Sequence, residues 1–234
     1  MATTFEAVSK NSTSDVFNTA GDAVTFAHNA GTNSNRILYV FVAWHSAGSH
    51  TIAAVTYNGV SVTSLGAAVQ ESNTLLQGFR LINPATGSNT VSVDPSAGSV
   101  NRSVAIIAVS YYDNDQSTGF ENYTTANATD SSAPFEADIT VTSATNNRVV
   151  AAAGARQAAT WTSGQTQRDT IINSTAGDIS LVVSDAAGAA SVVMDHTANT
   201  AINYCVMGLS SIAAAAGGLS IPIAMRHYLN MGNN

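Results

Sequence analysis

Charged side chains are scarce in this chain of 234 residues. They make up 10% of the sequence, and Lys10 is the only lysine, whereas a soluble domain usually carries roughly 25% charged residues. The surface must therefore be covered mainly by Ser, Thr, Asn, Ala and Gly, which are cheap to desolvate compared with charged groups. This composition favours a protein that packs against other proteins.

Positive charge is the scarcer of the two signs. Eight Lys and Arg stand against fifteen Asp and Glu, for a formal net charge of -7, and the seven arginines are scattered along the chain. Proteins that bind nucleic acids or anionic membranes concentrate basic residues in one patch. We therefore expect no nucleic acid and no membrane among the partners.

Cysteine and long apolar runs are also nearly missing. The single cysteine, Cys205, lies in the apolar run 202–209, which predicts a buried thiol and excludes an intrachain disulfide. No apolar run approaches the roughly 18 residues that suggest a membrane helix. The N-terminus lacks a basic segment followed by an apolar one, so we expect no secretory signal, synthesis in a host cytoplasm and release by lysis.

Motifs for catalysis are missing as well. No HExxH pair, CxxC pair, GxSxG elbow or phosphate-binding GxxxxGK[ST] loop occurs. Asp185 and Asp195 bracket the segment DAAGAASVVMD, but the small residues 186–190 predict a turn and not the cleft that a pair of glycosidase carboxylates needs. We expect a protein that is not an enzyme and that needs no cofactor.

Strand-like runs bounded by Gly, Asn, Asp and Ser recur every 8 to 15 residues, the spacing of a β-sandwich or barrel. The runs 36–44 and 103–112 are apolar on both faces and predict central strands. No internal repeat is evident. The twelve predicted strands are 23–28, 36–44, 52–57, 75–82, 90–93, 102–112, 135–141, 148–153, 166–172, 179–183, 190–195 and 201–212. They predict one all-β, two-sheet antiparallel sandwich over residues 1–212.

The segment after the last predicted strand differs in character, because two glycines are followed by apolar and aromatic residues that do not alternate. We predict a C-terminal arm over residues 213–234. It either folds back over its own sandwich or inserts into a partner, and the sequence leaves both open. The arm residues expected to act in assembly are Ile221, Ile223, Met225, Tyr228 and Leu229.

Aromatic side chains are the candidates for binding a glycan, because a sugar ring stacks on an exposed aromatic face. Trp161 lies among small polar residues and Trp44 ends a predicted strand. The alternative is that both belong to the core or close the open end of the sandwich. Trp44, Trp161, Tyr111, Tyr112 and Tyr123 are the candidate stacking residues.

One acidic loop is a candidate for Ca²⁺, which prefers oxygen ligands. Asp113, Asp115 and Glu121 supply three carboxylates in the long polar segment 113–134. They lack the spacing and the glycine of an EF-hand loop, so the favoured interpretation is an ordinary Asx-rich turn and no metal site.

The order of several segments resembles a known group of proteins. A strand LYVFVAW, a hairpin VTYNGVSVTSL and a strand SVAIIAVSYY surround a phrase with the pattern Leu-x-x-Pro-x-x-Gly-x-x-x-Val-x-Val, here Leu81, Pro84, Gly87, Val91 and Val93. Over about residues 20–212 the chain resembles the jelly-roll (concanavalin A-like) β-sandwich proteins found among structural open reading frames of tailed bacteriophages. The matched residues are turn and core positions, so no catalytic residue carries over.

These observations together predict a bacteriophage virion structural protein. It would be a capsid decoration, spike or tail-associated subunit, located in the virion and acting by assembly. Its expected partners are further copies of itself, as a trimer or dimer, and other virion proteins such as the major capsid protein. A carbohydrate-binding module for host-surface glycans and a self-polymerising surface filament subunit are the alternatives.

Overall fold

The chain is all-β, as predicted. The computed structural model describes residues 1–12, 15–17, 22–45, 51–96, 102–129, 134–157, 160–172, 179–199 and 203–215. These residues form five antiparallel sheets and contain no helix. No helix long and apolar enough to cross a membrane therefore occurs in these ranges.

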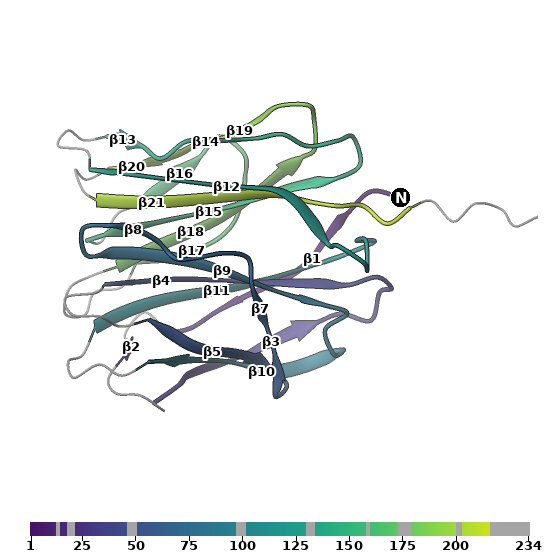
Figure 1. Cartoon of the computed structure of the whole chain (residues 1–234), viewed down its shortest axis with the longest axis horizontal. Coiled ribbons are helices and arrows are strands. Elements are labelled where there is room, and N and C mark those ends of the chain that lie inside the picture. Colours follow the sequence, from purple (N-terminus) through teal and green to yellow (C-terminus); the bar gives the residue numbers. More distant parts are fainter. Residues whose placement is uncertain are drawn as a thin grey trace, which may run out of the picture.

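The sheets stack as four layers (Figure 1). In the first layer the strands follow the order β3 (Val24–Ala30), β10 (Gly87–Pro95), β5 (Ile52–Tyr57) and β6 (Val60–Ser61). In the second layer the order is β1 (Thr4–Lys10), β11 (Arg102–Tyr112), β4 (Ile37–His45), β9 (Thr74–Ile82) and β7 (Thr63–Ser64), while β2 (Val16–Phe17) pairs with β11 and β8 (Val69–Glu71) pairs with β9. Strands β1 to β11 thus build the first two layers.

Strands β12 to β21 build the other two layers. The third layer follows the order β12 (Phe120–Thr129), β21 (Asn203–Ser211), β15 (Arg148–Arg156), β18 (Ile179–Ala187) and β17 (Thr166–Ile172). The fourth layer consists of two small sheets, one of β13 (Phe135–Glu136), β20 (His196–Ala198) and β16 (Trp161–Ser163), the other of β14 (Ile139–Val141) and β19 (Val192–Met194). The second and third layers face each other in the middle of the molecule (Figure 1).

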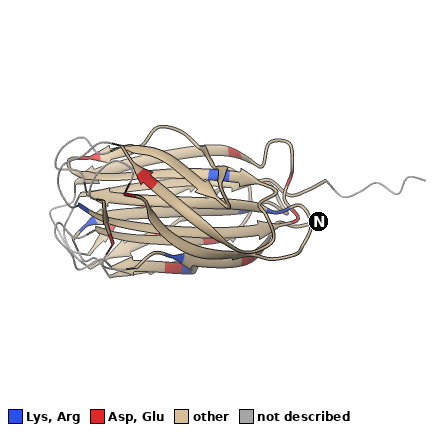
Figure 2. Cartoon of the chain, turned by 90° about the horizontal axis from the view of Figure 1, so that it is seen from below, with Lys and Arg blue, Asp and Glu red and all other residues tan. Residues whose placement is uncertain are grey.

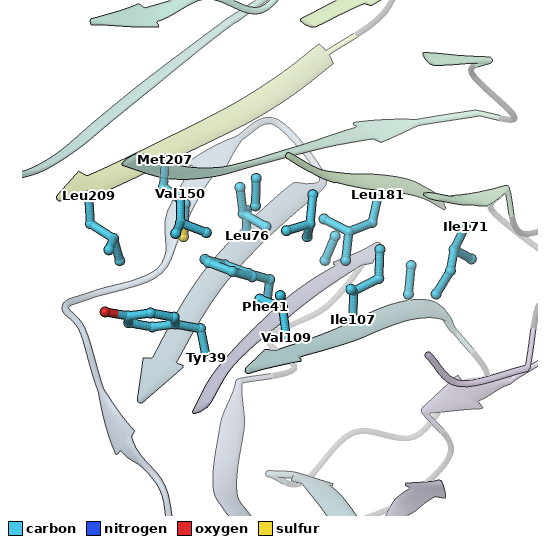
Figure 3. Close-up of a cluster of buried hydrophobic side chains, with 14 of the residues drawn as sticks. Tyr39, Phe41, Leu76, Ile107, Val109, Val150, Ile171, Leu181, Met207 and Leu209 are labelled. Atoms are coloured by element: carbon cyan, nitrogen blue, oxygen red, sulfur yellow. The ribbon is translucent and has the colours of Figure 1, made fainter. Parts of the chain in front are cut away.

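Three hydrophobic cores lie between the four layers. Strand β4 contributes to two of them: Val40 and Val42 contact the first layer, whereas Tyr39 and Phe41 point the other way into the middle core (Figure 3). This is why the run is apolar on both faces. Cys205 is buried in the same middle core, as predicted, and burial raises the pKa of its thiol to about 12.

In the middle core, large side chains of one sheet pack against small side chains of the facing sheet. Tyr39 and Phe41 on the second layer are opposed by the small residues of β15, among them Ala152. A Cβ atom placed on Gly154 would lie 2.9 Å from the Cβ of Ala43 in the facing sheet, closer than real side chains approach. Glycine at this position therefore allows the close approach of the two sheets.

The prediction of a two-sheet sandwich is wrong in the number of layers. Alternation shows which residues of a strand face a core, but it does not show how many sheets cover the strand, and here both faces of two sheets are covered. The predicted C-terminal arm, including Ile221, Ile223, Met225, Tyr228 and Leu229, lies outside the described residues apart from 213–215.

The two halves of the chain share one topology, which the sequence did not reveal. The order β1-β11-β4-β9 of the second layer corresponds to β12-β21-β15-β18 of the third, and β3-β10-β5 of the first layer corresponds to β13-β20-β16 of the fourth. The chain therefore traces the same path between two sheets twice, and the two units pack through their inner sheets.

Candidate functional site

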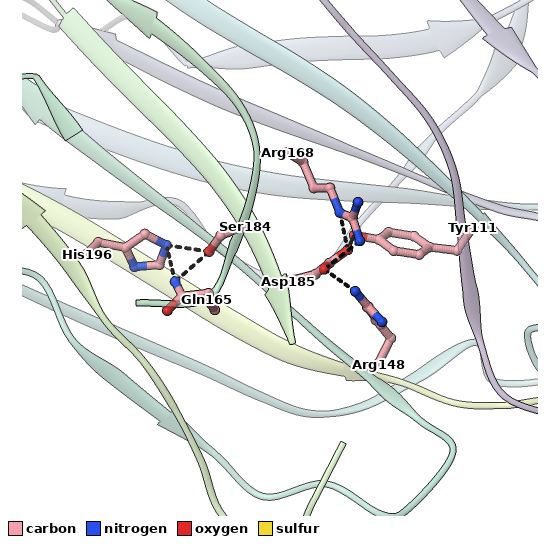
Figure 4. Close-up of polar contacts among 7 residues, drawn as sticks. All are labelled: Tyr111, Arg148, Gln165, Arg168, Ser184, Asp185 and His196. Atoms are coloured by element: carbon pink, nitrogen blue, oxygen red, sulfur yellow. Dashed lines mark hydrogen bonds and ion pairs between the residues drawn. The ribbon is translucent and has the colours of Figure 1, made fainter. Parts of the chain in front are cut away.

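A buried carboxylate forms the centre of a polar cluster between the two halves. Asp185 on β18 is fully buried and points toward the second layer. Arg168 on β17 binds it with two bonds, from Nε to Oδ2 at 2.6 Å and from Nη2 to Oδ1 at 2.9 Å. Arg148 Nη2 donates to Oδ1 at 2.5 Å, and the Tyr111 hydroxyl donates to Oδ2 at 2.9 Å (Figure 4).

The cluster connects the two halves of the chain. Burial, and then the Asp185 carboxylate, raise the pKa of Tyr111 well above its ordinary value, so this hydroxyl stays a donor. The guanidinium of Arg168 also lies over the Phe5 ring, 3.9 Å from its centre. Strands β1 and β11 of the first half are thereby joined to β17 and β18 of the second.

The neighbouring residue, Ser184, points to the opposite face of β18 because side chains alternate along a strand. Its Oγ lies 2.7 Å from Nε2 of His196 and 2.7 Å from Nε2 of Gln165 (Figure 4). Burial lowers the pKa of His196 to about 4, so the imidazole is neutral at pH 7. Ser184 and His196 are both fully buried, so this pair does not offer a nucleophile to a substrate in solution.

An open pocket of about 710 Å³ lies beside this network. Its lining includes Arg148, Gln165, Thr166, Asp185, Val193 and Asp195. Between the two aspartates the chain crosses from β18 in the third layer to β19 in the fourth, so the turn does not close a hairpin, and the expectation that no cleft lies there is wrong. The second wall comes from the segment around Gln165, whose Oε1 accepts a hydrogen bond from the Asp195 backbone N–H at 3.0 Å.

The two pocket aspartates have different environments. Both oxygens of Asp185 are occupied by the arginines and Tyr111. Asp195 is half-buried at the pocket wall, where its Oδ1 accepts from the Thr197 hydroxyl at 3.3 Å. Asp195 is therefore the carboxylate that a bound molecule can reach.

The solvent face of the first layer is a second candidate site, and we call it the hydroxyl face. Thr25, Ser92, Thr56 and Ser61 are directly opposite one another on β3, β10, β5 and β6 and form a row across the whole sheet. A second pair, Ala27 and Thr90, lies one step along the strands. Other outward positions are Asn29, Ala54, Ser88 and, as the single charged residue of the face, Asp94.

Three of the predicted stacking residues have no exposed ring face. Trp44 and Tyr111 are fully buried in cores, and Trp161 is 4% exposed. The Trp161 indole donates to Ser180 Oγ at 3.0 Å and its ring packs edge-on against Phe135. These residues face inward because a neighbouring layer covers each of them, so they are not surfaces on which a sugar can stack.

The other two predicted stacking residues are half-buried and lie on different strands. Tyr112 ends β11 opposite Thr4. Tyr123 on β12 packs edge-on against Phe120. The structure does not bring Tyr112 or Tyr123 to the pocket.

The acidic loop forms an Asx-rich turn, the interpretation that the sequence favoured. Asp115 Oδ1 accepts hydrogen bonds from the Thr118 backbone N–H at 2.7 Å and from the Ser117 hydroxyl at 2.7 Å, and these bonds are the main causes that lower its pKa to about 2. Glu121 instead accepts from Asn147 Nδ2. Within the described ranges, Asp113, Asp115, Glu121 and the other acidic, His and Cys residues form no group of three that could hold a metal ion.

Comparison of the chain with protein-family models, with curated proteins and with solved structures gave no match. The interpretation of the two candidate sites therefore depends on their chemistry alone.

Proposed function

We propose that this chain is a structural subunit of a bacteriophage virion, a capsid decoration, spike or tail-associated protein that acts by assembly and not by catalysis. The observation that carries the proposal is the hydroxyl face. Thr25, Ser92, Thr56 and Ser61 cross four strands without a charged neighbour in their row. Burying such a face under another subunit leaves no unpaired ion.

Charged residues are sparse along the described strands (Figure 2). Asp185, one of the fifteen acidic residues, is buried, and Arg148 and Arg168 are largely buried against it. The exposed surface is therefore even poorer in charge than the composition indicates. Small hydroxyl and methyl groups contribute little free energy per contact, so such a surface suits repeated, symmetric contacts among many copies.

We further propose that each half is a jelly-roll sandwich. The support is the strand order: β1-β11-β4-β9 faces β3-β10-β5-β6 in the first half, with successive long strands alternating between the two sheets. Jelly rolls of two four-stranded sheets occur in viral capsid and lectin domains. This fold is compatible with the proposed role and does not by itself select it.

The proposal is tested by the mass of the purified protein over a range of concentrations and by co-sedimentation with capsids assembled without it. We expect an oligomer, or binding to capsids, that Thr90→Arg in the middle of the hydroxyl face weakens at least about tenfold, because the arginine would be buried without a partner. Thr140→Arg, at an exposed position of the fourth layer, is the matched control. A strict monomer that binds no capsid would overturn the proposal.

A further inference from the structure

We propose that the pocket beside Asp195 binds a neutral saccharide. This site lies in the second half of the chain, in the third and fourth layers, and does not depend on the hydroxyl face of the first layer. The argument uses the charge of the lining, the rigidity of its walls and the groups that remain free to contact a ligand.

The charge of the pocket argues against a strongly charged ligand. Its lining holds one cationic side chain, Arg148, and two carboxylates, Asp185 and Asp195. Arg148 shares the Asp185 carboxylate with Arg168, and the second carboxylate, Asp195, balances the remaining positive charge, so a phosphate or carboxylate would find no net positive charge. Only one carboxylate is accessible, which is too few for a metal ion. A ligand with many neutral hydroxyl groups matches this balance best.

The walls are fixed before any ligand arrives. Gln165 bridges them, since its Oε1 accepts from the Asp195 N–H and its Nε2 contacts Ser184 and His196. A Cβ atom on Gly164 would lie 3.0 Å from Asp195 Oδ2, so the glycine lets the backbone approach this carboxylate. Binding therefore needs little ordering of the protein, which favours affinity for a small ligand.

The groups left free fit a sugar. The Asp195 carboxylate can accept two hydroxyl hydrogens from neighbouring positions of a ring, and the exposed Thr166 hydroxyl can donate or accept. Val193 is 57% exposed at the rim, and its methyl groups offer an apolar contact for the C–H face of the ring. The site combines polar groups with one apolar patch, as small-molecule sites commonly do.

The experiment uses the intact chain on an array of neutral oligosaccharides, followed by ¹H–¹⁵N NMR titration with the best array ligand. We expect shift changes centred on residues 164–166 and 193–195. Asp195→Ala should weaken binding at least about tenfold, because each charge-assisted hydrogen bond contributes on the order of one decade in affinity. Thr166→Ala should weaken it less.

The matched control is Asp94→Ala, because Asp94 is a half-buried aspartate on β10 of the first half and does not line the pocket. It should bind the saccharide like the unchanged protein, and thermal unfolding will show whether each variant is folded. Absence of binding to every neutral glycan would overturn the proposal. So would tighter binding of inorganic phosphate or glucuronate, or equal losses in Asp94→Ala and Asp195→Ala.

Discussion

The two halves of the molecule have the same topology but differ in the size of their side chains and in the length of their outer strands. In the first half the inner strand β4 carries large residues, ILYVFVAWH, and the outer strands β3, β5 and β10 are six to nine residues long. In the second half the corresponding β15 reads RVVAAAGAR, and the outer strands are two or three residues long. The same topology is thus formed with large residues on the inner strand of one half and with small residues on the inner strand of the other.

The difference continues in the interiors. Both halves bury polar side chains, among them His28 and Ser110 in the first half, but the one buried carboxylate among the described residues, Asp185, belongs to the second half. Short outer strands satisfy fewer backbone groups, and side chains such as Gln165 take over part of this task. Members of this polar network, Gln165 among them, line the pocket at the edge of the second half.

The largest effect should come from breaking the buried cluster. Asp185→Ala leaves Arg148 and Arg168 partly buried without their carboxylate and should cost about 3 to 5 kcal/mol of unfolding free energy. Urea denaturation monitored by tryptophan fluorescence measures this loss. Asp94→Ala in the first half, where the aspartate is half-buried at a sheet face, should cost much less. Similar losses in the two variants would contradict the central role of the cluster.

A second effect compares one buried histidine in each half. Burial lowers the pKa of His28 and of His196 to about 4, against an ordinary value of 6.5. Between these pH values the unfolded chain binds a proton at each histidine and the native state does not. The contribution of each histidine to the free energy of unfolding is therefore complete above pH 6.5 and is lost as the pH falls toward 4. Each should add a slope of about 1.4 kcal/mol per pH unit in that window.

Denaturation at several pH values between about 7 and 5 tests this. His28→Gln and His196→Gln should each reduce the pH dependence of the unfolding free energy by the contribution of one proton, and the double variant should reduce it by two. A variant that keeps the full slope would show that its histidine is not held neutral in the native state. If only His196→Gln changes the slope, the halves differ in this property too.

Much of this fold was predictable because period-two alternation is a local signal. Strands β5, β11 and β17 were predicted at their observed bounds. Strand β1 was missed because a register shift between Phe5 and Ala7 breaks the alternation. The segment of β12 was predicted as a surface loop with at most a short strand around Tyr123, because the ten-residue strand is largely exposed and polar, FENYTTANAT.

The pocket and the number of layers were not predictable for a different reason. Arg148, Gln165 and Asp195 are brought together by pairing of distant strands, and no spacing in the sequence signals it. The same holds for Trp161 and Tyr111, which looked like binding residues because the layer that covers each is remote in sequence. Only the small residues near Asp195 hinted that the backbone turns sharply there.

A smaller effect should follow from altering the contact between the inner sheets. Gly154→Ala places a methyl group against Ala43 of the other half and should cost about 1 to 3 kcal/mol through overpacking. Ala43→Gly in the same chain should recover part of that loss, so a double-mutant cycle measured by urea denaturation gives a favourable coupling. Strictly additive losses would show that the two positions do not touch.

The smallest effect should come from the exposed ion pair between the halves. Lys10 Nζ on β1 lies 2.7 Å from Asp169 Oδ1 on β17 and also donates to the Thr170 carbonyl at 2.9 Å. Because both side chains reach solvent, Lys10→Met should cost at most about 1 kcal/mol of unfolding free energy, and less in high salt. Asp169→Asn is the partner variant for a double-mutant cycle. A loss that matches Asp185→Ala would mean that the edge, and not the buried cluster, joins the halves.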